Sequence, residues 1–224
     1  MTKAIFFDLF FTLIYPEYLD ENENDVIGIT ISEWEEYAEN NELYNERARG
    51  KIKNEREIID KIVNPMPYQI TEIQKQKILE KREERIKKAL FIVDKKILDT
   101  LRKIRMRGFK LGIISNADVI DIKYWNDSPL SELFDLALFS CDVGMIKPET
   151  EIYQLAMNKL EVTPEESIFV GDGGSNELYG AQSAGMKTIF SEYLDCKSVD
   201  QKELLKKYAD FHINSFDEIL NCID

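Results

Sequence analysis

Short apolar runs that alternate with helical patterns constrain the fold of this chain more than any other feature. Six runs are expected to be strands, at residues 4–7, 110–114, 136–139, 167–170, 187–190 and 211–213. Several are apolar at consecutive positions, as in parallel strands buried on both faces. Helical patterns lie between them, and Asp94, Pro148 and Ser175 stand at helix starts. We therefore predict an α/β fold with a doubly wound parallel sheet and right-handed crossovers.

The segment 16–93 departs from this alternation. It contains few strand-like runs, and its patterns predict helices at about 32–50, 55–63 and 71–90. It is also far too long to be a loop. We therefore predict that residues 16–93 form an inserted all-helical domain, and that residues 1–15 and 94–224 form the α/β core.

Composition excludes several classes of protein. Lys and Arg number 29 against 42 Asp and Glu, which gives a net charge of −13 and argues against nucleic-acid and anionic membrane partners. No apolar run approaches the roughly 20 residues of a membrane span. The single histidine, His212, excludes a two-histidine metal site, and three distant cysteines support neither a zinc ribbon nor a disulfide framework. We predict a cytoplasmic protein, a monomer or homodimer, with no signal peptide at its N-terminus.

Polar side chains directly follow four of the predicted strands. Asp8 follows the first, Ser115 and Asn116 the second, Lys147 comes shortly after the third, and Asp172 lies in a glycine-rich loop after the fourth. Ligands of open α/β sheets bind beyond the carboxyl ends of the strands. The sequence therefore predicts that a carboxylate, a hydroxyl, an ammonium and a second carboxylate meet at one edge of the sheet.

These groups suit magnesium-assisted hydrolysis of a phosphate ester. Mg²⁺ takes one or two carboxylates and keeps several waters, and phosphoryl transfer depends on positioning and charge neutralisation. A carboxylate can itself be the nucleophile, so Asp8 is a candidate to form an acyl-phosphate. Other phosphate-binding and hydrolytic motifs, GxGxxG, GxxxxGK[ST] and GxSxG, are missing. The expected partner is a small anionic molecule.

Four motifs at these positions resemble the haloacid dehalogenase (HAD) superfamily, whose members are largely phosphohydrolases. They are FFDLFFTLI with Asp8, LGIISNAD with Ser115, GMIKPET with Lys147, and FVGDGGSNELYGAQSAGM with Asp172 and Glu177. Their order, spacing and strand context match the family over nearly the whole core. The helical insertion resembles the family's cap domain in its C1 placement.

The resemblance implies a set of metal ligands. Asp8 would attack phosphorus and also bind Mg²⁺, and the backbone carbonyl of Phe10 would be a second ligand. Asp172 would be the main carboxylate ligand of the fourth motif. Glu177 would stand where many members have aspartate, binding the metal directly or through water.

The resemblance also implies substrate contacts. Ser115 would donate a hydrogen bond to the phosphoryl group, and Lys147 would neutralise the nucleophile and the transferring group. Thr12 would support the turn after the nucleophile, and we count it with Phe10 and Asn116 among the substrate-binding residues.

One position departs from the pattern of the family's phosphatases. They usually have an aspartate two residues after the nucleophile, which protonates the leaving group and then activates water. Phe10 stands there and transfers no proton. The loss of such a group typically costs about 10²–10⁴ in rate. Three interpretations stay open, namely a substrate with a good leaving group, another proton donor, or a weakened enzyme.

Other branches of the family provide alternative functions. 2-Haloacid dehalogenases work without metal, and the retained Asp172 and Glu177 favour a magnesium enzyme over them. A third alternative is a weakly active regulatory module with a residual Mg²⁺ site.

The first half of the insertion contains one basic cluster in an acidic stretch, formed by Arg47, Arg49 and Lys51. We predict that Arg49 and Lys51 meet an anionic substrate across the site. A phosphonate hydrolase would need a cap lysine for a Schiff base, and Lys51 and Lys53 are the candidates.

Overall fold

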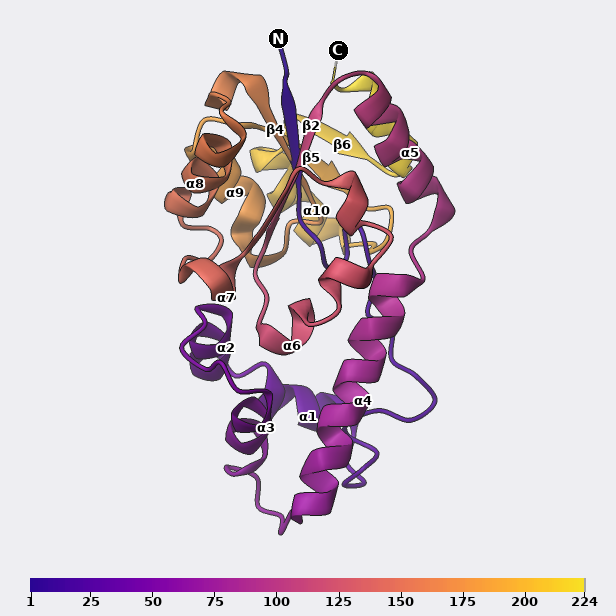
Figure 1. Ribbon diagram of the computed structural model, residues 1–224, viewed down its shortest axis with the longest axis vertical. Coiled ribbons are helices and arrows are strands. Elements are labelled where there is room, and N and C mark those ends of the chain that lie inside the picture. Colours follow the sequence, from indigo (N-terminus) through magenta and orange to yellow (C-terminus); the bar gives the residue numbers. More distant parts are fainter. Residues whose placement is uncertain (224) are drawn as a thin grey trace.

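The computed structural model describes residues 1–223, and its sheet and most of its inserted helices lie at opposite ends of an elongated molecule (Figure 1). Six parallel strands form one sheet in the order β3-β2-β1-β4-β5-β6. The strands are β1 (Ala4–Phe7), β2 (Lys110–Ser115), β3 (Leu136–Phe139), β4 (Ser167–Gly171), β5 (Lys187–Ser191) and β6 (Phe211–Ile213). The predicted doubly wound α/β fold is confirmed.

Both faces of the sheet are covered, which explains why its strands are apolar at consecutive positions. Side chains alternate across a strand, so Ile5 and Phe7 of β1 belong to one apolar cluster and Phe6 to the other. Helix α5 packs in the first cluster, and α8 and α9 pack in the second. These helices are α5 (Lys95–Met106), α8 (Thr150–Leu160) and α9 (Glu177–Ser183), and the short α7 (Ser140–Val143) and α10 (Val199–Leu205) complete this end.

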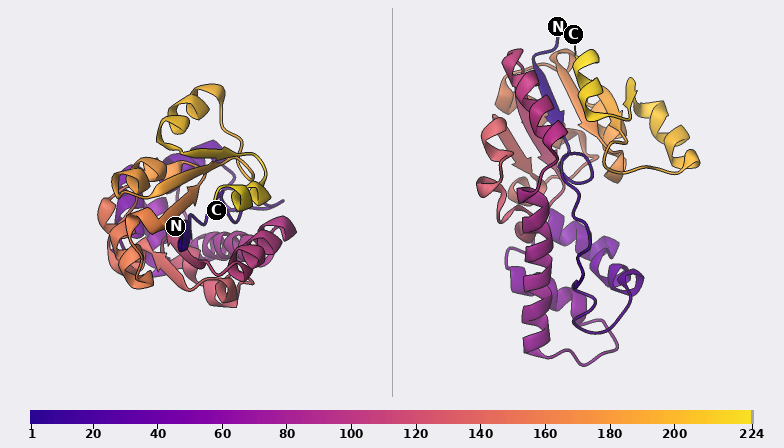
Figure 2. Two further views of the ribbon diagram at one scale, coloured as in Figure 1. Left: turned by 90° about the horizontal axis from the view of Figure 1, so that it is seen from above. Right: turned by 90° about the vertical axis from the view of Figure 1, so that its right-hand side faces the viewer.

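The inserted helices form an apolar cluster of their own beyond the carboxyl ends of the strands (Figure 2). They are α1 (Ile31–Ala38), α2 (Asn41–Ala48), α3 (Glu55–Val63) and α4 (Glu72–Phe91). The short helix α6 (Val119–Ile122), which follows β2, contributes Ile120 to this cluster. Residues just beyond Ser115 are therefore packed into the helical end.

Local chemistry explains where prediction and structure differ. The single helix expected at 32–50 is two helices, because Asn40 accepts hydrogen bonds from the backbone N–H groups of Glu42 and Leu43 and starts α2. Ser175 does not cap α9. It lies with Asn176 in the left-handed region, at φ of 51° and 52°, and α9 begins at Glu177. Asp94 caps α5 as predicted.

Among residues 1–223, the helices are all too short or too polar to cross a membrane.

Gly50 lets the helical end approach the sheet end closely. Its φ is +65°, and a methyl group there would lie 1.9 Å from the carbonyl oxygen of Cys141 in α7. Gly108 has a similar backbone conformation, at φ +89°, but open space around it. The two glycines therefore separate the cost of a left-handed backbone from the cost of a collision.

We expect Gly50→Ala to lower the free energy of unfolding by at least about 2 kcal/mol more than Gly108→Ala. The Gly108 variant bears only the left-handed penalty of about 1–2 kcal/mol, whereas the Gly50 variant adds overpacking against backbone. Urea unfolding of both variants measures the difference. Equal losses would contradict a close approach at Gly50.

Candidate active site

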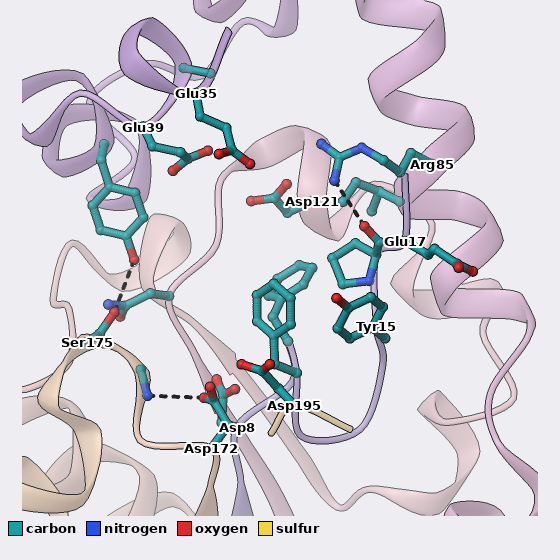
Figure 3. A pocket seen from close by; sticks show the side chains of 18 of the residues that line it. Asp8, Tyr15, Glu17, Glu35, Glu39, Arg85, Asp121, Asp172, Ser175 and Asp195 are labelled. Atoms are coloured by element: carbon teal, nitrogen blue, oxygen red, sulfur yellow. Dashed lines mark hydrogen bonds between the residues drawn. The ribbon is translucent and has the colours of Figure 1, made fainter. Parts of the chain in front are cut away.

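The central strands bring Asp8 and Asp172 to one edge of the sheet. Phe7 of β1 is in register with Val170 of β4, and each aspartate follows its strand by one or two residues. The Asp8 N–H donates to the Val170 carbonyl at 2.9 Å, which extends the pairing to the nucleophile position. Both carboxylates are buried and line one cavity (Figure 3).

Glu177 joins the two aspartates in a cluster able to hold a metal ion. One oxygen of each of Asp8, Asp172 and Glu177 lies within 4.8 Å of the others, and all three residues are buried. The Gly173 N–H donates to Glu177 Oε1 at 3.1 Å, and the Gly174 N–H donates to Asp172 Oδ1 at 3.1 Å. The glycine-rich loop thus fixes both carboxylates with backbone groups.

Lys147 is the ammonium group at the centre of this cluster. Its Nζ lies 2.5 Å from Asp8 Oδ1 and 2.5 Å from Glu177 Oε2, and its side chain is only 2% exposed. Asn116 positions this lysine, because its amide donates to the Lys147 carbonyl at 3.1 Å and accepts from the Lys147 N–H at 2.8 Å. Asn116 also lines the cavity, but both of its described contacts serve Lys147.

The electrostatics of the cluster show an excess of negative charge. Burial raises the pKa of Asp8 and of Glu177, while the nearby Lys147 ammonium lowers both. The same two carboxylates raise the pKa of Lys147 against the effect of its burial. Three clustered carboxylate oxygens from Asp and Glu are the donors that hard divalent cations prefer, so the donor set fits such an ion.

The turn after Asp8 supports its carboxylate. Phe11 has a φ of 62°, and its N–H donates to the Ile14 carbonyl at 2.7 Å. This turn places the Thr12 hydroxyl 3.3 Å from Asp8 Oδ2, to which it donates. Phe10 lines the cavity beside Asp8.

Ser115 lies at the end of β2, next to β1, and is fully buried. Its hydroxyl donates to the Asn116 carbonyl at 3.4 Å, and it does not contribute to the wall of the cavity.

A cavity of about 860 Å³ lies between the carboxylates and the inserted helices. Figure 3 shows Glu35 and Glu39 pointing into it from the side opposite Asp8 and Asp172. The Tyr44 and Ser175 hydroxyls lie 3.5 Å apart and join α2 to the glycine-rich loop. The helical segment therefore covers the candidate site.

Arg49 and Lys51 are not brought to this cavity, which corrects their predicted role. Arg49 forms an ion pair with Glu149 and donates to the Gly144 carbonyl. Lys51 is exposed on the surface. The third member of the basic cluster, Arg47, lines the cavity instead.

The arginines that line the cavity are already paired with carboxylates. Arg47 binds Glu39 at 2.7 Å, and Arg85 binds Glu23 at 2.8 Å. A third arginine, Arg82, binds the buried carboxylate of Asp118, which follows β2, at 2.7 Å. No sequence motif indicated these pairs, because each one joins segments far apart in the chain.

Lys197 is the cavity residue that strand-end reasoning came nearest to finding. It lies six residues beyond β5, and its Nζ is 2.5 Å from Asp172 Oδ2 and 2.5 Å from Asp195 Oδ2. The same rule that selected Asp8 and Asp172 applies to the end of β5. The intervening loop separated Lys197 from its strand in the sequence.

Comparisons with known proteins agree with this geometry. The family model of haloacid dehalogenase-like hydrolases matches residues 2–185. Glyceraldehyde 3-phosphate phosphatase of Pyrococcus furiosus is 31% identical over 128 residues, which cover 56% of this chain and 52% of that protein. The match thus spans about half the length of this curated relative.

Two solved structures share the fold. A dehalogenase superposes with a TM-score of 0.69 at 18% identity, covering 99% of this chain and 96% of that one. A HAD family enzyme from Bacteroides thetaiotaomicron, in complex with magnesium and inorganic phosphate, gives 0.68 at 20% identity, covering 90% of this chain and 99% of that one.

We expect Lys147→Met, measured in EDTA, to lower the free energy of unfolding by about 3–5 kcal/mol near pH 7, because it leaves two buried carboxylates without their cation. Without Lys147 the pKa values of Asp8 and Glu177 rise further above those of the unfolded chain. The folded state then binds more protons than the unfolded state, so stability falls as pH rises. The deficit should therefore shrink as pH is lowered toward about 4–5.

Urea unfolding at several pH values measures this dependence. Lys61→Met, which removes the partner of Glu46 in an exposed pair, is the matched control and should cause little change. A Lys147→Met deficit that does not vary with pH would contradict the assigned electrostatics.

Proposed function

The chain belongs to the haloacid dehalogenase-like hydrolases, and on this premise we propose that it is a Mg²⁺-dependent phosphohydrolase acting on small phosphate monoesters through Asp8. The observation that carries the proposal is the buried cluster of Asp8, Asp172 and Glu177 around Lys147. The phosphatase relative and the magnesium and phosphate complex of a structural neighbour support it.

We propose that Asp8, Asp172 and Glu177, together with the backbone carbonyl of Phe10, hold Mg²⁺. When bound, the ion neutralises charge on the phosphoryl oxygens. The excess of carboxylates over ammonium groups in this cluster supports the assignment, because an added cation offsets the repulsion among them.

The chain's own residues carry the remaining steps of the proposed reaction. The Asp8 carboxylate attacks phosphorus, the bond from phosphorus to the ester oxygen breaks, and a phosphoaspartate forms. Water then attacks its phosphorus, which releases inorganic phosphate and restores the carboxylate. Thr12 orients Asp8 by its hydrogen bond, Lys147 neutralises the transferring group, and Ser115 donates to a phosphoryl oxygen.

Phe10 and the wall of the cavity bear on the kind of substrate. Phe10 supplies no proton to a departing alkoxide, so we propose a substrate whose leaving group departs as a stabilised anion. The cavity arginines Arg47, Arg82 and Arg85 are already paired with carboxylates. A second anionic group on the substrate would have to compete with those carboxylates, which favours a monoester with a neutral remainder.

We propose that the segment 16–93 acts as the cap. It covers the cavity and would exclude water around the phosphoaspartate between the two steps. The contact between Tyr44 and Ser175 supports this role, because it ties the cap to the loop that carries Asp172.

A 2-haloacid dehalogenase is the second candidate, favoured by Phe10 at the position of the missing aspartate. The retention of Asp172 and Glu177 beside Asp8 weighs against it, since that reaction proceeds without a metal. A weakly active Mg²⁺-binding module is the non-enzymatic alternative.

We expect p-nitrophenyl phosphate to be hydrolysed with Mg²⁺ and not with EDTA. Asp8→Asn should lower kcat by at least about 10³, because it removes the nucleophile. Asp142→Asn, at an exposed aspartate near the end of β3, should leave the rate unchanged. Release of chloride from 2-chloropropionate in EDTA would overturn the phosphohydrolase assignment, and Mg²⁺ binding without turnover of either compound would favour the module.

We expect the wild-type enzyme to hydrolyse p-nitrophenyl phosphate at least about 10²-fold faster than a simple alkyl phosphate, which is the size of effect that a missing general acid produces. Measured kcat/KM values along a series of leaving groups of increasing pKa test this. A rate independent of the leaving group would show that another residue supplies the proton.

A further inference from the structure

The ammonium group of Lys197 lies on one of the carboxylates assigned to the metal. It is 2.5 Å from Asp172 Oδ2 and 2.5 Å from Asp195 Oδ2, and the Lys197 side chain is only 15% exposed. Asp195 lies in the loop after β5 and lines the same cavity as Asp8 (Figure 3). One lysine therefore bridges a proposed metal ligand and a carboxylate outside the metal cluster.

The loop that carries Lys197 is anchored, so this approach is part of the fold. The Lys197 N–H donates to Glu192 Oε1 at 3.2 Å. Glu192 is buried and is also bound by Lys202 at 2.8 Å and by His212 at 2.5 Å. These contacts hold the backbone of Lys197 beside the sheet edge and leave its long side chain to reach Asp172.

Charge explains why an ammonium group is stable there. Asp8, Asp172 and Glu177 lie within 4.8 Å of one another, and Lys147 contacts only Asp8 and Glu177 among them. Asp172 is left to Lys197. Like charges at such separations repel strongly unless a cation is near. Mg²⁺ and the Lys197 ammonium therefore meet the same electrostatic need at Asp172.

We propose that Lys197 is a tethered cation that occupies Asp172 when the metal is absent and so sets the affinity of the site for Mg²⁺. Asp195 is the second seat of the ammonium group, to which it withdraws when Asp172 ligates the ion. Lys197 and Asp195 are thus positioning residues that act through Asp172. This inference rests on the proposed metal site.

Two substitutions have opposite expected effects on Mg²⁺ binding. Lys197→Met removes the competitor and should tighten binding by about five- to tenfold, the equivalent of one partly exposed ion pair. Asp195→Asn removes the second seat, holds the ammonium on Asp172 alone and should weaken binding. Isothermal titration calorimetry of the substrate-free protein with MgCl₂ measures both.

The double variant separates competition from a general change of charge. In the Lys197→Met background, Asp195→Asn should no longer alter Mg²⁺ affinity, because Asp195 acts only through the lysine. Lys206→Met, which removes an exposed lysine outside the cavity, is the matched control and should leave the affinity unchanged.

A second measurement does not depend on calorimetry. Without metal, Lys197→Met should lower the melting temperature, because Asp172 loses its cation. The rise in melting temperature on addition of MgCl₂ should be larger than in the wild type.

Several results would overturn the proposal. Wild-type binding of Mg²⁺ with unchanged or weaker binding by Lys197→Met would refute it and leave the proposed function intact. An Asp195→Asn effect that persists in the double variant would show that Asp195 acts on the ion directly. No Mg²⁺ binding by any variant would overturn this inference and the proposed metal site together.

Discussion

The buried ammonium of Lys147 is the interaction on which the arrangement of this site depends. Parallel strands deliver Asp8 and the loop of Asp172 to one edge of the sheet, and α9 adds Glu177. Carboxylates collected in this way repel one another in a medium of low polarity, so they need a cation within hydrogen-bond distance. Asn116 supplies the precision, because its amide fixes the backbone that carries the lysine. Stability and function therefore compete for the same few charges.

Reasoning from the sequence located most of the site because the carboxyl ends of parallel strands share one edge. The same reasoning failed for the basic cluster of the insertion, for a geometric reason. Side chains two positions apart on a helix point to nearly opposite sides, so when Arg47 faces the cavity, Arg49 faces Glu149. The ion pairs of Arg82 and Arg85 left no trace in the sequence, since their partners are fixed only by tertiary packing.

The region around Phe10 combines two unusual properties. The position beside the nucleophile is aromatic, and the cationic side chains of the cap are already neutralised by carboxylates. A pocket of this kind stabilises the transferring phosphoryl group on the core side and offers the rest of the substrate little additional positive charge. Discrimination among substrates would then depend on the shape of the cavity and on the chemistry of the departing group.

Helix α6 belongs to the sheet by connectivity and to the cap by packing. Ile120 is buried in the apolar cluster of the inserted helices, and Asp118 is bound by Arg82 of α4. The cap is therefore not a module bounded by positions 16 and 93. A chimera that exchanged only that segment for the cap of a relative would leave Asp118 as a buried charge without its arginine and Ile120 without its neighbours. Transplanting the specificity of one such enzyme onto another requires the turn after β2 to travel with the insertion.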